Sequence, residues 1–129
     1  KVKKEKPVFQ KTAFIFTYKN LYMIHKREDE GLLANLYEIP NVDSFFTVDE
    51  AQEYLQTKHI IYESIQEIGE VKHIFSHQIW IIKVYFVSLQ EKIRHELFVS
   101  SKEIQEKYSL PTVFQKVWNL QKEKNQKLV

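Results

Sequence analysis

The residue types best suited to chemistry in this chain stand side by side at Phe75, Ser76 and His77, with Gln78 following. A hydroxyl donates and accepts hydrogen bonds, an imidazole can contact an anion, and an aromatic ring can stack on a flat partner. Runs of β-branched and aromatic residues lie on both sides, as is typical of β-strands. The simplest interpretation is a β-hairpin with Phe75, Ser76 and His77 at its tip. An ordinary turn with a buried Phe is the alternative, and these three residues alone favour it.

The two strands of this hairpin are expected over residues 62–74 and 79–87. Gly69, within the first strand, indicates a β-bulge. The second strand is apolar almost throughout, which is typical of a strand buried on both faces. Because loop tips on a rigid sheet often carry binding residues, the hairpin tip is the candidate binding site.

Hydrophobic patterning places the hairpin within a larger α+β fold. Further strands are expected over residues 8–18, 21–24, 36–39 and 95–99. Two helices follow capping boxes, and a last helix begins at Pro111-Thr112. The resulting order, β-β-β-α-β-β-β-α-α, predicts one α+β domain with a mostly antiparallel or mixed sheet packed by helices. The capping boxes run from Thr47 to Glu50 and from Ser100 to Glu103, and the last helix buries Val113, Val117, Trp118 and Leu120.

Composition limits the classes of function. The chain of 129 residues has no cysteine, which excludes disulfides, thiol nucleophiles and cysteine-ligated metal sites within it. The net charge is only +2 and the arginines are only Arg27 and Arg94, so a dense phosphate- or base-reading surface is not expected. No apolar run reaches the roughly 18 residues of a membrane span, and no signal-peptide pattern is present. A cytoplasmic protein is therefore expected.

Both ends of the sequence are polar. Residues 1–7 are rich in lysine, which indicates either the end of a connector to another domain or a solvated tail. Residues 8–122 are expected to form the domain, and residues 123–129 to form a frayed tail. The chain begins at Lys1 and its only methionine is Met23, so we expect it to be a piece of a longer protein.

Three segments resemble one known domain. Residues 31–40 read GLLANLYEIP, residues 69–77 read GEVKHIFSH and residues 110–118 read LPTVFQKVW. In this order and spacing they resemble the C-terminal domain of the adenine DNA glycosylases of the MutY family, with its GLLAxLWEFP segment, its hairpin with a Phe-Ser-His loop and its FPxSHQKxW ending. The resemblance covers about residues 8–120. Its departures fall at positions that we interpret as structural, namely Asn35, Tyr37 and Phe114.

This resemblance implies a Nudix-like α/β/α sandwich, in which helices flank a mixed sheet. In the family, this domain helps to recognise 8-oxoguanine in double-stranded DNA, while an N-terminal helical domain with a 4Fe-4S cluster removes the mispaired adenine. We therefore expect a monomeric recognition domain with no catalytic activity or cofactor of its own, in a bacterial, nucleoid-associated adenine DNA glycosylase. The implied partners are the lesion-containing duplex and the protein's own glycosylase domain, and a replication clamp is a further candidate partner.

The chemistry of the tip suits that role. Oxidation at C8 turns N7 of guanine into a donor and adds a carbonyl acceptor, and the hydroxyl of Ser76 can pair with both. Such a pair of hydrogen bonds is worth ~1–3 kcal/mol of discrimination. Phe75 could wedge into a base step or pin the hairpin to the core, and the two interpretations are balanced. His77 could contact a phosphate or support the loop, and Lys72 and Gln78 are secondary DNA-binding candidates.

A Nudix pyrophosphohydrolase is the competing enzymatic function. It requires an Arg-Glu-x-x-Glu-Glu motif that holds Mg²⁺ beside a diphosphate. No arginine lies between Arg27 and Arg94, so this motif is absent. Asp49, Glu50 and Glu53 lie on the corresponding helix, but acids in a first turn are explained by the helix dipole.

Two further functions fit parts of the sequence. A zinc site at His73 and His77 would bracket a hairpin tip, and it lacks a third ligand nearby. A protein-interaction module of a repair factor could use the edge of the sheet or the last helix. The second of these functions stays open.

Overall fold

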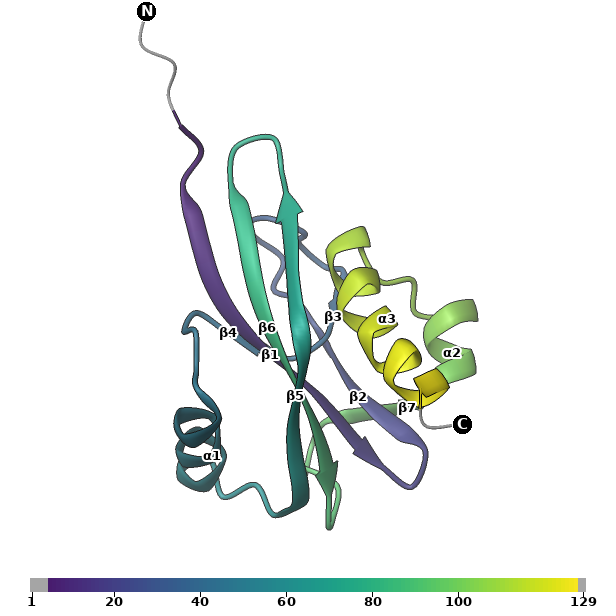
Figure 1. Cartoon of the computed structure of the whole chain (residues 1–129). Coiled ribbons are helices and arrows are strands. Elements are labelled where there is room, and N and C mark those ends of the chain that lie inside the picture. Colours follow the sequence, from purple (N-terminus) through teal and green to yellow (C-terminus); the bar gives the residue numbers. More distant parts are fainter. Residues whose placement is uncertain (1–4, 128–129) are drawn as a thin grey trace, which may run out of the picture.

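The computed structural model describes residues 5–127, which form a mixed β-sheet with helices on both of its faces (Figure 1). The sheet has the strand order β3-β2-β1-β6-β5, with β4 paired to β1 and β7 paired to β2. This architecture confirms the predicted α+β class. The strands are β1 (Val8–Tyr18), β2 (Leu21–Lys26), β3 (Tyr37–Glu38), β4 (Asn41–Val42), β5 (Tyr62–Ile74), β6 (Ile79–Leu89) and β7 (Leu97–Ser100), and the helices are α1 (Val48–Thr57), α2 (Ser101–Glu106) and α3 (Thr112–Lys127).

The centre of the sheet is a parallel pair, β1 and β6. Their register runs from Val8 opposite Ile79 to Thr17 opposite Ser88. The other strand pairs are antiparallel. One parallel pair among antiparallel ones makes the sheet mixed, as the resemblance implied.

Strands β5 and β6 form the predicted hairpin, which extends beyond the helices at one end of the molecule (Figure 1). Their register slips between Glu67 and Gly69, where the expected bulge is found. Gly69 has a φ of +144° there, and a Cβ at this position would meet the side chain of Leu120 on α3 at 3.4 Å. Glycine therefore serves both the strand geometry and the close packing of α3.

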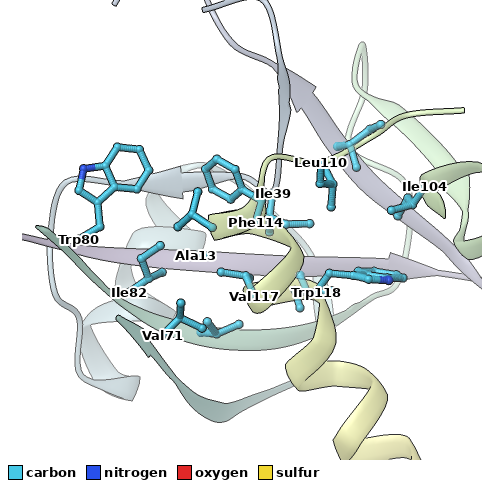
Figure 2. Packing of buried hydrophobic residues seen from close by; sticks show 14 of the residues in the cluster. Ala13, Ile39, Val71, Trp80, Ile82, Ile104, Leu110, Phe114, Val117 and Trp118 are labelled. Carbon is cyan, nitrogen blue, oxygen red and sulfur yellow. The ribbon is translucent and has the colours of Figure 1, made fainter. Parts of the chain in front are cut away.

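Two hydrophobic clusters lie on the two faces of the sheet. The first is covered by α2 and α3, whose Ile104, Val113, Phe114, Val117 and Trp118 pack over the sheet (Figure 2). The second is covered by α1 through Ala51 and Leu55. The apolar face predicted for the last helix is confirmed, because Val113, Val117 and Trp118 are buried and Leu120 is partly buried against the same cluster.

The predicted burial of β6 is correct for only part of the strand. Val84, Tyr85 and Val87 are fully buried, whereas Ile79 and Ile81 are partly exposed on the face that α1 covers. Helix α1 lies at the end of the sheet opposite the hairpin tip (Figure 1). Only the part of that face that α1 reaches is therefore buried.

Both capping boxes are present as predicted. The hydroxyl of Thr47 accepts a hydrogen bond from the amide of Glu50, whose carboxylate accepts one from the Thr47 amide. Ser100 and Glu103 repeat the arrangement at the start of α2. These bonds satisfy backbone donors that no helical carbonyl reaches.

The short strands and the C-terminal end differ from expectation. The strand expected over residues 36–39 is limited to Tyr37–Glu38, and β4 follows Pro40 although no strand was predicted there. Helix α3 continues to Lys127, so most of the segment expected to fray is helical, and residues 128–129 lie outside the described part. Lysine, glutamine and glutamate are good helix formers, which explains how a polar sequence extends the helix.

Within residues 5–127, no helix is both long enough and apolar enough to cross a membrane.

Phe114 offers a test of the larger core cluster. Its ring is fully buried beneath α3, so Phe114→Ala should lower the free energy of unfolding by about 3–5 kcal/mol. Ile61→Ala is the matched control, because Ile61 is 50 % exposed and its loss should change stability by less than ~0.5 kcal/mol. Urea unfolding followed by circular dichroism measures both. Equal stabilities for the two variants would show that Phe114 is not part of the core.

Candidate functional site: the hairpin tip

The tip is a tight turn that presents two polar side chains. Strand β5 ends at Ile74, β6 begins at Ile79, and the amide of Phe75 donates to the carbonyl of Gln78 at 2.8 Å. Ser76 and His77 lie between these closing residues and are exposed. The sheet therefore holds a hydroxyl and an imidazole at its outermost point.

Phe75 is held by other aromatic rings. It is partly buried, and it meets Trp80 edge-on at 4.8 Å and His73 edge-on at 4.6 Å between ring centroids. Trp80 in turn lies 6.1 Å from Phe114 of α3. Edge-to-face pairs of this kind stabilise a fixed ring arrangement. Phe75 thus has the contacts of a residue that pins the turn to the core.

Trp80 connects the tip to polar groups as well. Its indole Nε1 donates to Oε1 of Gln78 at 2.7 Å, and Nζ of Lys11 lies 4.4 Å from the ring centroid. A cation over an aromatic face is attracted by the quadrupole of the ring. Gln78, a secondary candidate from the sequence, therefore has its side-chain oxygen occupied by Trp80.

The N-terminal segment also contacts the tip. The amide of Ile79 donates to the carbonyl of Pro7 at 2.9 Å, and Nζ of Lys6 donates to the carbonyl of Phe75 at 2.9 Å. Of the expected connector, residues 1–4 lie outside the described residues. The described residues that precede β1 are thus hydrogen-bonded to both sides of the turn.

Lys72 and His73 lie on opposite faces of the ribbon, close to the tip. Lys72 is exposed, whereas His73 is partly buried and its Nδ1 lies 3.0 Å from Nζ of Lys116 on α3. Burial, and secondarily the charge of Lys116, lower the pKa of His73 below its usual value of 6.5. A neutral imidazole nitrogen that accepts from a lysine is not free for a metal. In residues 5–127, no group of three or more His, Cys, Asp and Glu side chains is placed to hold a metal ion.

A polar pocket of about 270 Å³ lies beside this site, and the sequence analysis did not detect it. Glu38 is buried and accepts from Arg27 at 2.6 Å and from Asn41 at 2.9 Å, and it pairs with His25 at 2.9 Å. Lys11, also buried, pairs with Asp43. The one signal in the sequence is a lysine within an otherwise strand-forming segment. Its ion-pair partner Asp43 lies 32 positions away, so no local pattern reveals the pair.

The acids of α1 do not fit the metal site of a Nudix hydrolase. The carboxylate of Glu50 is engaged in the capping box, and its hydrogen bond to the Thr47 backbone is the main cause that lowers its pKa. Asp49 and Glu53 remain exposed, and within residues 5–127 no group of three acids includes them in an arrangement that could hold a metal ion.

These features can be compared with known proteins. The NUDIX domain profile matches residues 12–120, so the chain belongs to the NUDIX domain family. No curated protein sequence matches it.

Solved structures share the fold at low sequence identity. The C-terminal domain of mouse MUTYH, solved in complex with human PCNA, is 20 % identical with a TM-score of 0.69, and the match covers 91 % of this chain and 89 % of that one. The MutT protein of Methanosarcina mazei Go1 is 17 % identical with a TM-score of 0.65, covering 95 % and 99 %. The NUDIX domain of Shewanella oneidensis NrtR, complexed with ADP ribose, is 9 % identical with a TM-score of 0.58, covering 95 % and 89 %. Such likenesses show the Nudix-like fold that the resemblance implied.

The pair of His73 and Lys116 leads to a prediction about pH. Removing the cation with Lys116→Gln should raise the pKa of His73 toward 6.5, and burial should keep it below that value. Because the folded-state pKa is depressed, neutral His73 favours the folded state above the unfolded-state pKa of about 6.5. This stability is lost as the pH falls below 6.5 toward the folded-state pKa, and the loss should be smaller in the variant.

Titration of the imidazole by NMR measures the pKa of His73 in both proteins. Lys102→Gln serves as the control, because Lys102 is an exposed lysine on α2. An unchanged His73 pKa in the Lys116 variant would show that burial alone causes the depression.

Proposed function

We propose that this chain is the 8-oxoguanine-recognition domain of an adenine DNA glycosylase of the MutY type. Three segments that resemble the C-terminal domain of that family support the proposal, as does the structural likeness to the mouse MUTYH domain. NUDIX domain family membership alone is compatible with several functions. The choice among them depends on the chemistry of the tip.

The observation that carries the proposal is the exposed hydroxyl of Ser76 on a turn that is fixed from several sides. The turn is closed by the bond from Phe75 to Gln78, and Phe75 packs against Trp80. A rigid support lowers the entropy lost when a side chain binds a partner. Ser76 can accept from the N7–H of 8-oxoguanine and donate to its C8 carbonyl, a combination that guanine does not offer.

The neighbouring residues complete this function. His77 is exposed beside Ser76 and can contact a phosphate, and Lys72 can do the same from the adjacent strand. The mispaired adenine would be flipped and excised by the glycosylase domain, which also carries the 4Fe-4S cluster in this proposal. The chain itself would then contribute recognition and no catalytic residue.

A replication clamp is the protein partner that this proposal includes. The mouse domain was solved in a complex with PCNA. A clamp would bring the repair protein to newly copied DNA, where a mispaired adenine is on the new strand. We also propose the bacterial cytoplasm, at the nucleoid, as the setting of this function.

Nudix hydrolysis is the competing function, because it is the chemistry of the MutT-type relatives. It would need carboxylates on α1 that are free to bind Mg²⁺. Glu50 serves as a helix cap, and only Asp49 and Glu53 remain. These residues do not support that chemistry.

The principal test replaces Ser76 by alanine in the full-length protein. Adenine excision opposite 8-oxoguanine should slow by roughly ten- to a hundredfold, because the loss of two base-specific hydrogen bonds costs ~1–3 kcal/mol. Excision opposite guanine should change little. Single-turnover rates on the two duplexes, at one salt concentration, measure the difference.

Ser101→Ala is the matched control, since Ser101 is an exposed serine on α2, away from the tip. It should leave both rates unchanged. If Ser76→Ala slows both substrates equally, or neither, the tip does not read the lesion.

A second experiment addresses the competing function. Nucleoside triphosphates and ADP ribose, incubated with the chain and Mg²⁺, should release no pyrophosphate, nucleoside monophosphate or ribose 5-phosphate above the buffer rate. Hydrolysis that is abolished by Glu53→Gln would instead establish a Nudix enzyme and overturn the proposed function.

A further inference from the structure

A row of aliphatic side chains crosses three strands directly behind the tip. Val8 of β1 lies opposite Ile79 of β6, and Ile79 lies opposite Ile74 of β5. Residues in register on adjacent strands place their side chains on the same face of a sheet. The row therefore forms one continuous apolar strip across the end of the sheet.

This strip is open to solvent. Ile74 is 58 % exposed and Val8 is 53 % exposed, and Ile74 is the most exposed large hydrophobic side chain within the described residues. None of the three belongs to either core cluster or packs against one. Helix α1, which covers this face, lies at the far end of the sheet (Figure 1). Within residues 5–127, the fold therefore leaves Val8 and Ile74 mostly uncovered and Ile79 partly exposed.

The next rows of the same face add positive charge. Ile81 lies between Gln10 and Lys72, and beyond it Lys83 lies between Thr12 and Glu70. Lys72 is exposed, and Nζ of Lys83 lies 4.4 Å from the ring centroid of Phe45. On the side away from the tip, the apolar strip is thus followed first by Lys72 and then by Lys83 with the exposed Glu70 beside it.

On the opposite face of the β5–β6 hairpin, the side chains pack against other parts of the protein. Phe75 packs between His73 and Trp80, and the first cluster extends from Trp80 toward Phe114 (Figure 2). Phe75 cannot insert into a partner without giving up both ring contacts. Ile74 has no comparable contact to lose.

We propose that Ile74, rather than Phe75, is the apolar side chain by which the tip enters duplex DNA, with Val8 and Ile79 against the adjacent sugars and Lys72 near a phosphate. This inference rests on the proposed function and deepens it by assigning the face of the sheet on which the duplex lies. Aliphatic side chains inserted at a base step are a recurring device of DNA-bending proteins. Ile74 lies two residues from Ser76, so both would reach the same base step.

The shape of the surface favours DNA over a protein partner. The strip spans three strands, of which β5 and β6 form the hairpin that extends beyond the helices (Figure 1). A hairpin of two strands fits the major groove of DNA. The flanking lysines match a phosphate backbone.

The test measures the affinity of the full-length protein for two duplexes, one with 8-oxoguanine opposite adenine and one with guanine opposite adenine. Ile74→Ala should weaken binding to both by roughly tenfold, because it removes apolar area buried on either duplex. The dependence of affinity on salt should stay the same, since no charge is lost. Lys72→Gln should instead reduce the slope of log K against log salt concentration by about one, because one phosphate contact is lost.

Ile61→Ala is the matched control, because Ile61 is 50 % exposed and lies at the start of the ribbon, far from the tip. It should bind both duplexes like the wild type. Ile74→Leu should bind both duplexes like the wild type, because leucine keeps an aliphatic side chain of the same size at the base step. Unfolding midpoints in urea show whether the variants are folded.

The outcomes separate this inference from the proposed function. If Ile74→Ala weakens binding while Ser76→Ala leaves lesion selectivity intact, the strip binds DNA and the lesion-reading proposal fails. If Ile74→Ala and Ile61→Ala both bind like the wild type, the strip does not contact DNA and this inference fails. Normal DNA binding combined with weakened binding to a purified clamp would reassign the strip to a protein partner and also overturn it.

Discussion

The parallel pairing of β1 with β6 is the interaction on which the rest of the structure depends. It joins residues about 70 positions apart in the chain and makes both strands central, so that each has a neighbour on either side. Each face of this pair carries one of the two hydrophobic clusters. The same pairing brings Pro7 against Ile79 and so places the start of the domain beside the hairpin tip.

Local sequence patterns predicted much of the fold. The strand boundaries at Ile74 and Ile79, the bulge near Gly69 and the two capping boxes all follow from residues close together in the chain. Phe114 was interpreted as structural and is fully buried. These features depend on backbone preferences and short-range hydrogen bonds, which a single sequence contains.

Features that depend on distant residues were not predictable in the same way. The apolar sequence of β6 indicated burial on both faces, but helix α1 covers only part of one face. The sequence of β6 contains no information about the length of α1, so this difference could not be predicted from it. The network around Glu38 joins short segments whose order in space is set by the sheet. For the candidate site, the sequence indicated Phe75, Ser76 and His77, whereas the aromatic support from Trp80 and the engagement of Gln78 required the structure.

The position of β5 has a consequence for the solubility of the domain. This strand of 13 residues forms one edge of the sheet, and such an edge can template pairing between molecules. Here the exposed Glu63, Glu67 and Glu70 lie along it, and two register irregularities interrupt its flat surface. Charge repulsion and irregular geometry both oppose edge-to-edge aggregation.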